Sequence, residues 1–340
     1  MSTPQPSRET PRTAPAPAGA VRGEPAVGLV SPGPPTGGIR HSEVLARARE
    51  ADALSRVQAA RNPVPAPPPP DAGRAGRNLP AAIGVGIGLG ALFLACLFLV
   101  PAAMPGLVGL GVVLGTLELT RALGQGGLRI PAMPVMVGGV GMVVSTVVFG
   151  VDGLMVAMAV AICVLIIWRA SESMGLPALR DVCAGVLTLT WIPFLACFVL
   201  LLQERPDGAF AVLLAVVVPV LNDIGGYLAG VLFGRHPMAP SISPKKSWEG
   251  FAGSLLFGAG SAVAVVVLAM GGPWWIGLLL GVVLVLISTC GDLAESLIKR
   301  DLGIKDMGHL LPGHGGVLDR VDSILLAAPA TYILLEILLP

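Results

Sequence analysis

Long apolar stretches alternate with short polar segments from residue 80 to the end of the chain. A helix needs about 20 apolar residues to cross the hydrocarbon core of a bilayer. By that measure the pattern predicts about nine membrane-spanning helices, near residues 80–101, 104–122, 130–149, 153–168, 182–202, 209–233, 251–270, 273–290 and 323–339. We therefore expect an all-α polytopic membrane protein.

Residues 1–79 follow a different pattern. They are rich in proline, alanine, glycine and arginine, and four consecutive prolines occupy 67–70. Such a composition cannot bury an apolar core and is typical of disorder. The sequence therefore predicts two regions, a disordered tail over 1–79 and a transmembrane domain over 80–340.

Composition agrees with this division. The chain is 54% hydrophobic and only 13% charged, whereas about a quarter of the residues of a soluble domain are charged. The mean hydropathy is +0.80. A chain with so few charges lacks the polar surface that a water-soluble fold needs, so a soluble enzyme is excluded.

The cationic side chains indicate how the protein is oriented. Nine crossings place 21 of the 22 Lys and Arg residues on the side of the N-terminus, ten of them in residues 1–79, and leave only Arg205 on the other side. Lys and Arg are enriched in cytoplasmic loops. We expect a multi-pass protein of the cell membrane whose N-terminus and polar loops are cytoplasmic.

The first of two polar segments runs from the end of the 209–233 stretch to residue 250. Asp223 lies within an apolar run, where a carboxylate is costly and usually functional or paired. A structural partnership with Arg235 or with a lysine is the alternative interpretation.

Ser243 and Pro244 in this segment resemble a helix N-cap followed by proline at the first helical position. That interpretation puts Lys245 and Lys246 in the first turn, where the helix dipole favours anions. We therefore expect a phosphate to bind there. The alternative is that both lysines simply extend to the membrane interface.

The second polar segment, 291–323, holds six carboxylates, four cations and two histidines. If 292–300 is helical, Asp292, Glu295 and Lys299 share one face. Asp319 and Asp322 share a face where the last helix begins. Acids from two helix ends can converge on a hard cation such as Mg²⁺.

Other groups in this segment suit phosphate. Glycines at 313, 315 and 316 allow close approach of a ligand, and we expect His314, between two of them, to contact it. Four cations are available to neutralise phosphate charge, namely Lys299, Arg300, Lys305 and Arg320. A solvated charged loop is the simpler alternative for any one of these residues. Farther upstream, the spacing of Glu118 and Arg121 predicts a local ion pair.

These residues resemble the defining motif of the phosphatidate cytidylyltransferases, also called CDP-diacylglycerol synthases. The matching positions are Ser296-x-x-Lys299-Arg300, Lys305-Asp306, Pro312-Gly-His-Gly-Gly316 and Asp319-Arg320-x-Asp322. Residues 243–250 are similar to a second motif of the family, with Ser247 where threonine is commoner. The resemblance covers about 80–340 and leaves the tail outside it.

The resemblance implies that a phosphate oxygen of phosphatidic acid attacks the α-phosphorus of CTP, giving CDP-diacylglycerol and pyrophosphate. It implies a Mg²⁺ site at Asp292 and Asp319, and it allows a second cation there. The implied catalytic residues are Asp292, Lys299, Asp319 and Asp322. The implied substrate-binding residues are Asp223, Tyr227, Ser243, Pro244, Lys245, Lys246, Arg300, Lys305, His314 and Arg320.

The expected partners are CTP and phosphatidic acid in the bilayer, with no nucleic acid, and the resemblance adds a homodimer. Two alternatives remain open. One is a cytidylyltransferase that acts on another membrane lipid phosphate, such as a polyprenyl phosphate. The other is a non-enzymatic transporter, because intramembrane carboxylates also mark ion pathways.

Overall fold

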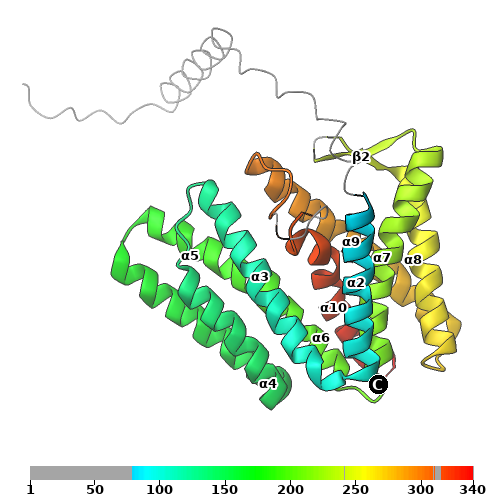
Figure 1. Ribbon diagram of the computed structural model, residues 1–340, viewed down its shortest axis with the longest axis horizontal. Coiled ribbons are helices and arrows are strands. Elements are labelled where there is room, and N and C mark those ends of the chain that lie inside the picture. Colours follow the sequence, from blue (N-terminus) through cyan, green and yellow to red (C-terminus); the bar gives the residue numbers. More distant parts are fainter. Residues whose placement is uncertain (1–78, 241, 309, 311–314, 340) are drawn as a thin grey trace, which may run out of the picture. The chain divides into compact units, whose positions relative to one another are not determined.

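The computed structural model describes residues 79–240, 242–308, 310 and 315–339. The predicted tail, apart from Leu79, lies outside these residues. The described chain is mostly helical, as the apolar pattern predicts (Figure 1). In order, its helices and strands are α2 (Leu79–Leu94), η1 (Ala95–Leu99), η2 (Pro101–Ala103), α3 (Met104–Gln125), α4 (Ala132–Glu172), α5 (Leu176–Leu189), η3 (Thr190–Phe194), α6 (Leu195–Gln203), α7 (Gly208–Phe233), β1 (Pro237–Ala239), β2 (Ser243–Ser247), α8 (Trp248–Leu268), α9 (Trp274–Asp301) and α10 (Leu318–Leu338).

Seven helical segments in the described residues are long and apolar enough to cross a membrane. The nine predicted crossings are therefore not confirmed. The first, near 80–101, corresponds to a shorter apolar helix, Gly84–Leu99. The third and fourth, near 130–149 and 153–168, both fall within α4.

The chain reverses direction inside α4. Gly150 has φ 60° and ψ −142°, which no helical residue adopts. A Cβ placed on Gly138 would lie 2.8 Å from the Cβ of Ala161, although residues so far apart on a straight helix would be separated by about 35 Å. The arms 132–149 and 151–172 therefore pack against each other as a hairpin. Glycine suits the turn because it tolerates positive φ.

One departure from an all-α fold lies between α7 and α8, where β1 and β2 pair antiparallel. The prediction that Ser243 caps the following helix is wrong. That helix begins at Trp248, and its cap is Ser247, whose Oγ accepts a hydrogen bond from the Gly250 N–H at 3.1 Å. Lys245 and Lys246 thus lie in an extended strand, so the helix dipole is not what would attract an anion to them.

The helices α7, α8, α9 and α10 pack closely around one another, and small residues let them approach. A Cβ on Gly291 of α9 would lie 3.3 Å from the backbone oxygen of Asp322 on α10. The β1–β2 hairpin and the orange end of α9 lie at the same end of these helices (Figure 1). A hydrogen bond at 3.2 Å from Arg300 Nε to the Ile242 oxygen joins them.

Candidate active site

Three carboxylates from two helices converge beside the close contact of α9 and α10. Asp292 and Glu295 come from α9, and Asp322 comes from α10. One oxygen of each lies within 4.8 Å of the other two. Glu295 is 1% exposed and Asp322 is 7% exposed. We call these three residues the acidic triad.

Lys299, one turn along α9 from Glu295, ties the triad to a fourth acid. Its Nζ lies 2.8 Å from Glu295 Oε2 and 2.6 Å from Asp319 Oδ1. Asp319 also accepts hydrogen bonds from the N–H groups of Met307 and Gly316. Asp319 is therefore next to the triad but not part of it, whereas the resemblance pairs Asp319 with Asp292 as metal ligands.

The triad suits a hard cation. Glu295 Oε1 is buried and has no hydrogen-bond partner in the described chain, and such an unsatisfied polar atom is unusual in a folded protein. Three acids in one place, balanced by few cations, favour an added positive charge. Carboxylate oxygens are the ligands that Mg²⁺ prefers.

On its other side the triad borders a cavity of about 260 Å³ between α7, α8, β2 and α9. Lys246 enters it from β2 and forms an ion pair with Asp292. Four residues predicted from the sequence line this cavity together with Asp292, namely Asp223, Tyr227, Lys245 and Lys246. Residues as far apart in the sequence as Asp223 and Asp292 thus line one cavity.

Asp223 is held by its neighbour on α7. Asn222 Nδ2 donates to Asp223 Oδ1 at 3.0 Å, and Ser254 Oγ of α8 donates to the Asn222 backbone oxygen at 2.7 Å. Among the described residues Asp223 forms no ion pair with Arg235, whose N–H donates to Glu249 instead. A structural pairing of Asp223 with Arg235 is therefore not seen in the described chain. Lys245 and Lys246 line the same cavity as Asp223, so pairing with a lysine stays an alternative.

The other predicted residues lie around this centre. Ser243 and Pro244 are on β2, and Arg300 binds the Ile242 oxygen. Lys305 lines a second cavity of about 520 Å³ near the end of α3. Arg320 is exposed in the first turn of α10. His314 lies outside the described residues.

Glu118 of α3 has partners that its spacing from Arg121 did not predict. It forms no ion pair with Arg121, and its carboxylate accepts hydrogen bonds from Val317 N–H at 3.0 Å and Leu318 N–H at 2.9 Å. The available signal was a carboxylate within an apolar stretch, which by default suggests function. Glu295 was placed on the correct helix face but was not counted among the site residues.

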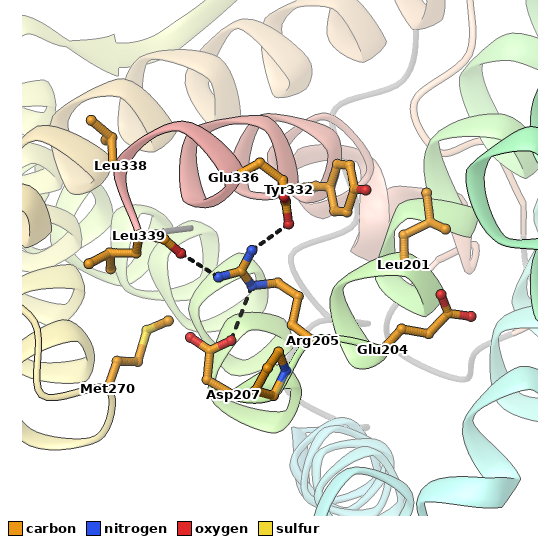
Figure 2. Close-up of a pocket in the computed structure, with 10 residues that line it drawn as sticks. Leu201, Glu204, Arg205, Asp207, Met270, Tyr332, Glu336, Leu338 and Leu339 are labelled. Carbon is orange, nitrogen blue, oxygen red and sulfur yellow. Dashed lines mark hydrogen bonds and ion pairs between the residues drawn. The ribbon is translucent and has the colours of Figure 1, made fainter.

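Another cavity, of about 710 Å³, is lined by the C-terminal end of α10 and by the loop between α6 and α7 (Figure 2). Figure 2 shows Arg205 at its centre, bonded to Asp207 at 3.1 Å, Glu336 at 2.5 Å and the Leu339 oxygen at 2.6 Å. None of the predicted site residues lines this cavity. Since every nitrogen of Arg205 is engaged, we interpret it as a structural link between α10 and the loop before α7.

The chain resembles known proteins over most of its length. The profile of the Cytidylyltransferase family matches residues 80–338. The phosphatidate cytidylyltransferase of Mycobacterium bovis is 42% identical over 283 residues, which are 80% of this chain and 92% of that protein. The phosphatidate cytidylyltransferase of Mycobacterium leprae is 42% identical over 280 residues, 78% of this chain and 90% of that protein. The chain therefore belongs to the cytidylyltransferase family.

Proposed function

We propose that this membrane protein transfers the cytidylyl group of CTP to phosphatidic acid, giving CDP-diacylglycerol and pyrophosphate. The two mycobacterial relatives bear the name of this activity. One observation carries the proposal: charged groups run without interruption from Lys246 through the acidic triad to Lys299 and Asp319. With a divalent cation on its carboxylates, such a row would bind several phosphate groups next to one another.

The reaction needs positioning and charge neutralisation more than it needs a covalent intermediate. An oxygen of the lipid phosphate forms a bond to the α-phosphorus of CTP. The bond from that phosphorus to the bridging oxygen of the β-phosphate breaks, and pyrophosphate leaves. Lys245, Lys246, Lys299 and Arg320 are the proposed cations that stabilise the negative charge on these phosphates.

We assign the metal to the acidic triad. Asp292, Glu295 and Asp322 would hold Mg²⁺, and the unsatisfied Glu295 oxygen supports this choice. When bound, the ion would neutralise phosphate charge. Asp319, the second ligand that the resemblance implies, contacts the triad through Lys299 and remains a proposed ligand. A second cation and a homodimer are also proposals from the resemblance alone.

The proposed topology has nine crossings, with the site on the cytoplasmic face of the cell membrane, where CTP is available. Two observations support it. The reversal at Gly150 turns α4 into two arms, and each arm is about as long as the 30 Å hydrocarbon core is thick. Arg205 alone among the 22 Lys and Arg residues falls on the opposite side in this arrangement.

A panel of lipid phosphates tests the substrate. Purified protein with CTP and Mg²⁺ should convert phosphatidic acid much faster than a polyprenyl phosphate. A preference for the polyprenyl phosphate would show that the protein catalyses the same cytidylyl transfer on a different lipid phosphate. Absence of CTP binding by calorimetry would favour a transporter and defeat the proposal.

A further inference from the structure

Glu118 reaches the active-site helices from a distant part of the sequence. It lies on α3 and is 2% exposed, yet its hydrogen-bond partners are 199 and 200 positions away. Those partners, Val317 and Leu318, are the N-cap and the first residue of α10. Asp319 and Asp322 follow within that helix's first turns.

The contact satisfies a need of the helix itself. The first N–H groups of a helix have no partner within it, and α10 has no side-chain cap of its own at Val317. The Glu118 carboxylate accepts hydrogen bonds from the N–H groups of Val317 and Leu318, and Asp319 accepts one from the N–H group of Gly316. A carboxylate is also favoured by the positive end of the helix dipole.

Gly308 and Gly316, in the loop before α10, pack closely against the Glu118 carboxylate. A Cβ on Gly308 would lie 2.6 Å from Glu118 Cδ, and one on Gly316 would lie 2.6 Å from Glu118 Oε2 and 2.9 Å from Asp319 Oδ2. Any larger residue would displace one of the two acids. Glu118 therefore lies close to Gly308 and Gly316, next to the Met307 and Gly316 N–H groups that donate to Asp319.

We infer that Glu118 is a positioning residue, which fixes the start of α10 so that Asp319 lies at the correct distance from Lys299. The same contact holds Asp322 at the correct distance from Asp292 and Glu295. The inference rests on the proposed function. Glu118 acts through α10: it lines the cavity that also holds Lys305, but both of its carboxylate oxygens accept hydrogen bonds from Val317 and Leu318. Its loss should therefore slow the chemical step and leave substrate affinity nearly unchanged.

The test compares Glu118→Ala and Glu118→Gln with the unaltered full-length protein in phospholipid nanodiscs. Amide hydrogen exchange in the peptide that contains Val317 and Leu318 should accelerate. Misplacement by about 1 Å can cost about 100-fold in rate, so kcat should fall by about 10- to 100-fold in Glu118→Ala. The KM values for CTP and phosphatidic acid should stay within about twofold.

Glu118→Gln should change amide exchange and kcat less than Glu118→Ala does, because the amide keeps one acceptor oxygen. This variant is also less prone to misfold. Thr120→Val is the matched control. Thr120 is buried on the same helix and bonds only to backbone of α3, so exchange at α10 and kcat should not change. Rates are compared per folded protein at a temperature below every melting point.

Faster exchange with an unchanged kcat would overturn the inference, since the contact would then serve folding alone. A raised KM, or a lower kcat without faster exchange, would also overturn it by giving Glu118 a direct role toward substrate. Failure of the unaltered protein to transfer the cytidylyl group would instead defeat the proposed function, and this role would fall with it.

Discussion

Lys299 links two helices because it contacts one carboxylate from each. Glu295 of α9 and Asp319 of α10 lie 2.8 Å and 2.6 Å from its ammonium nitrogen. Charge-assisted contacts of this length are among the stronger hydrogen bonds. The lysine therefore offsets part of the negative charge and leaves the triad of Asp292, Glu295 and Asp322 as the place for a divalent cation.

Asp322→Asn should weaken Mg²⁺ activation of the enzyme. The amide keeps the shape and one oxygen but removes a charge from the triad. We expect the Mg²⁺ concentration for half-maximal rate to rise at least about tenfold, a loss typical of a disturbed metal site. A Mg²⁺ titration of the transfer rate measures this.

Asp301→Asn is its control, because Asp301 is an exposed acid at the end of the same α9. Its Mg²⁺ titration should match that of the unaltered protein. Equal curves for both variants would remove Asp322 from the metal site.

Spacing along one helix predicted residue positions well, and contacts between helices were harder to predict. The i, i+3 and i+7 positions of Asp292, Glu295 and Lys299 do share a face. Glu118 was assigned to Arg121 because short-range rules consider only near neighbours. Its true partners at 317 and 318 depend on how α3 meets α10, and no local pattern encodes that.

At the scale of elements, the site depends on how α9, α10 and the loop between them fit together. Gly316 lies where a side chain would strike two carboxylates. The glycine at this motif position thus has a steric reason in addition to any contact with a ligand.

Gly316→Ala should lower the transfer rate by about tenfold or more, because the added methyl displaces Glu118 or Asp319. Gly111→Ala on α3 is the control. It adds the same methyl where no atom lies within 4 Å, and alanine favours the helix. A rate for Gly316→Ala equal to that of the control would show that the loop tolerates the methyl and that the packing argument fails.

Helix starts show why element boundaries were only partly predictable. Ser243 and Ser247 both satisfy the local rules for an N-cap. The pairing of 243–247 with 237–239 selects Ser247, and strand pairing is not visible in the capping pattern. Lys245 and Lys246 therefore lie on strand β2 and not in the first turn of a helix.

Arg205→Ala should reduce stability without reducing catalysis. The guanidinium joins the end of α10 to the loop before α7 (Figure 2), and its loss leaves charged partners unsatisfied. We expect a loss of about 2 kcal/mol, seen as a lower melting temperature, with the transfer rate unchanged below that temperature. Arg205→Lys keeps the charge but not the forked geometry. Its melting temperature should lie between those of the unaltered protein and Arg205→Ala. A slowed reaction at full stability would contradict a purely structural role.

At the scale of the whole molecule, hydropathy predicted the membrane class and most helices, whereas its count of nine crossings is not confirmed. Seven described segments meet the length and apolarity needed to span. The predicted break between 130–149 and 153–168 coincides with the non-helical backbone angles at Gly150. The distribution of Lys and Arg over nine crossings predicts the orientation, which stays a prediction.

Cysteine labelling tests the nine-crossing topology. In a background without the five native cysteines, Asp152→Cys should react with a membrane-impermeant maleimide on intact cells, because it lies two residues after the turn at Gly150. Asp301→Cys should react only after permeabilisation. If α4 crossed the membrane once as a straight helix, position 152 would lie near the bilayer centre and would stay unlabelled.

The central claim is that this protein transfers a cytidylyl group to phosphatidic acid, and that the charged residues from Lys246 to Asp319 form its active site. The most direct measurement supplies the purified protein with phosphatidic acid and with CTP labelled at its α-phosphate, with Mg²⁺ or with all divalent metal removed. We predict label in the lipid, one pyrophosphate released per lipid formed, and no transfer without metal. Transfer that persists without divalent metal, or label that never enters the lipid, would contradict the account.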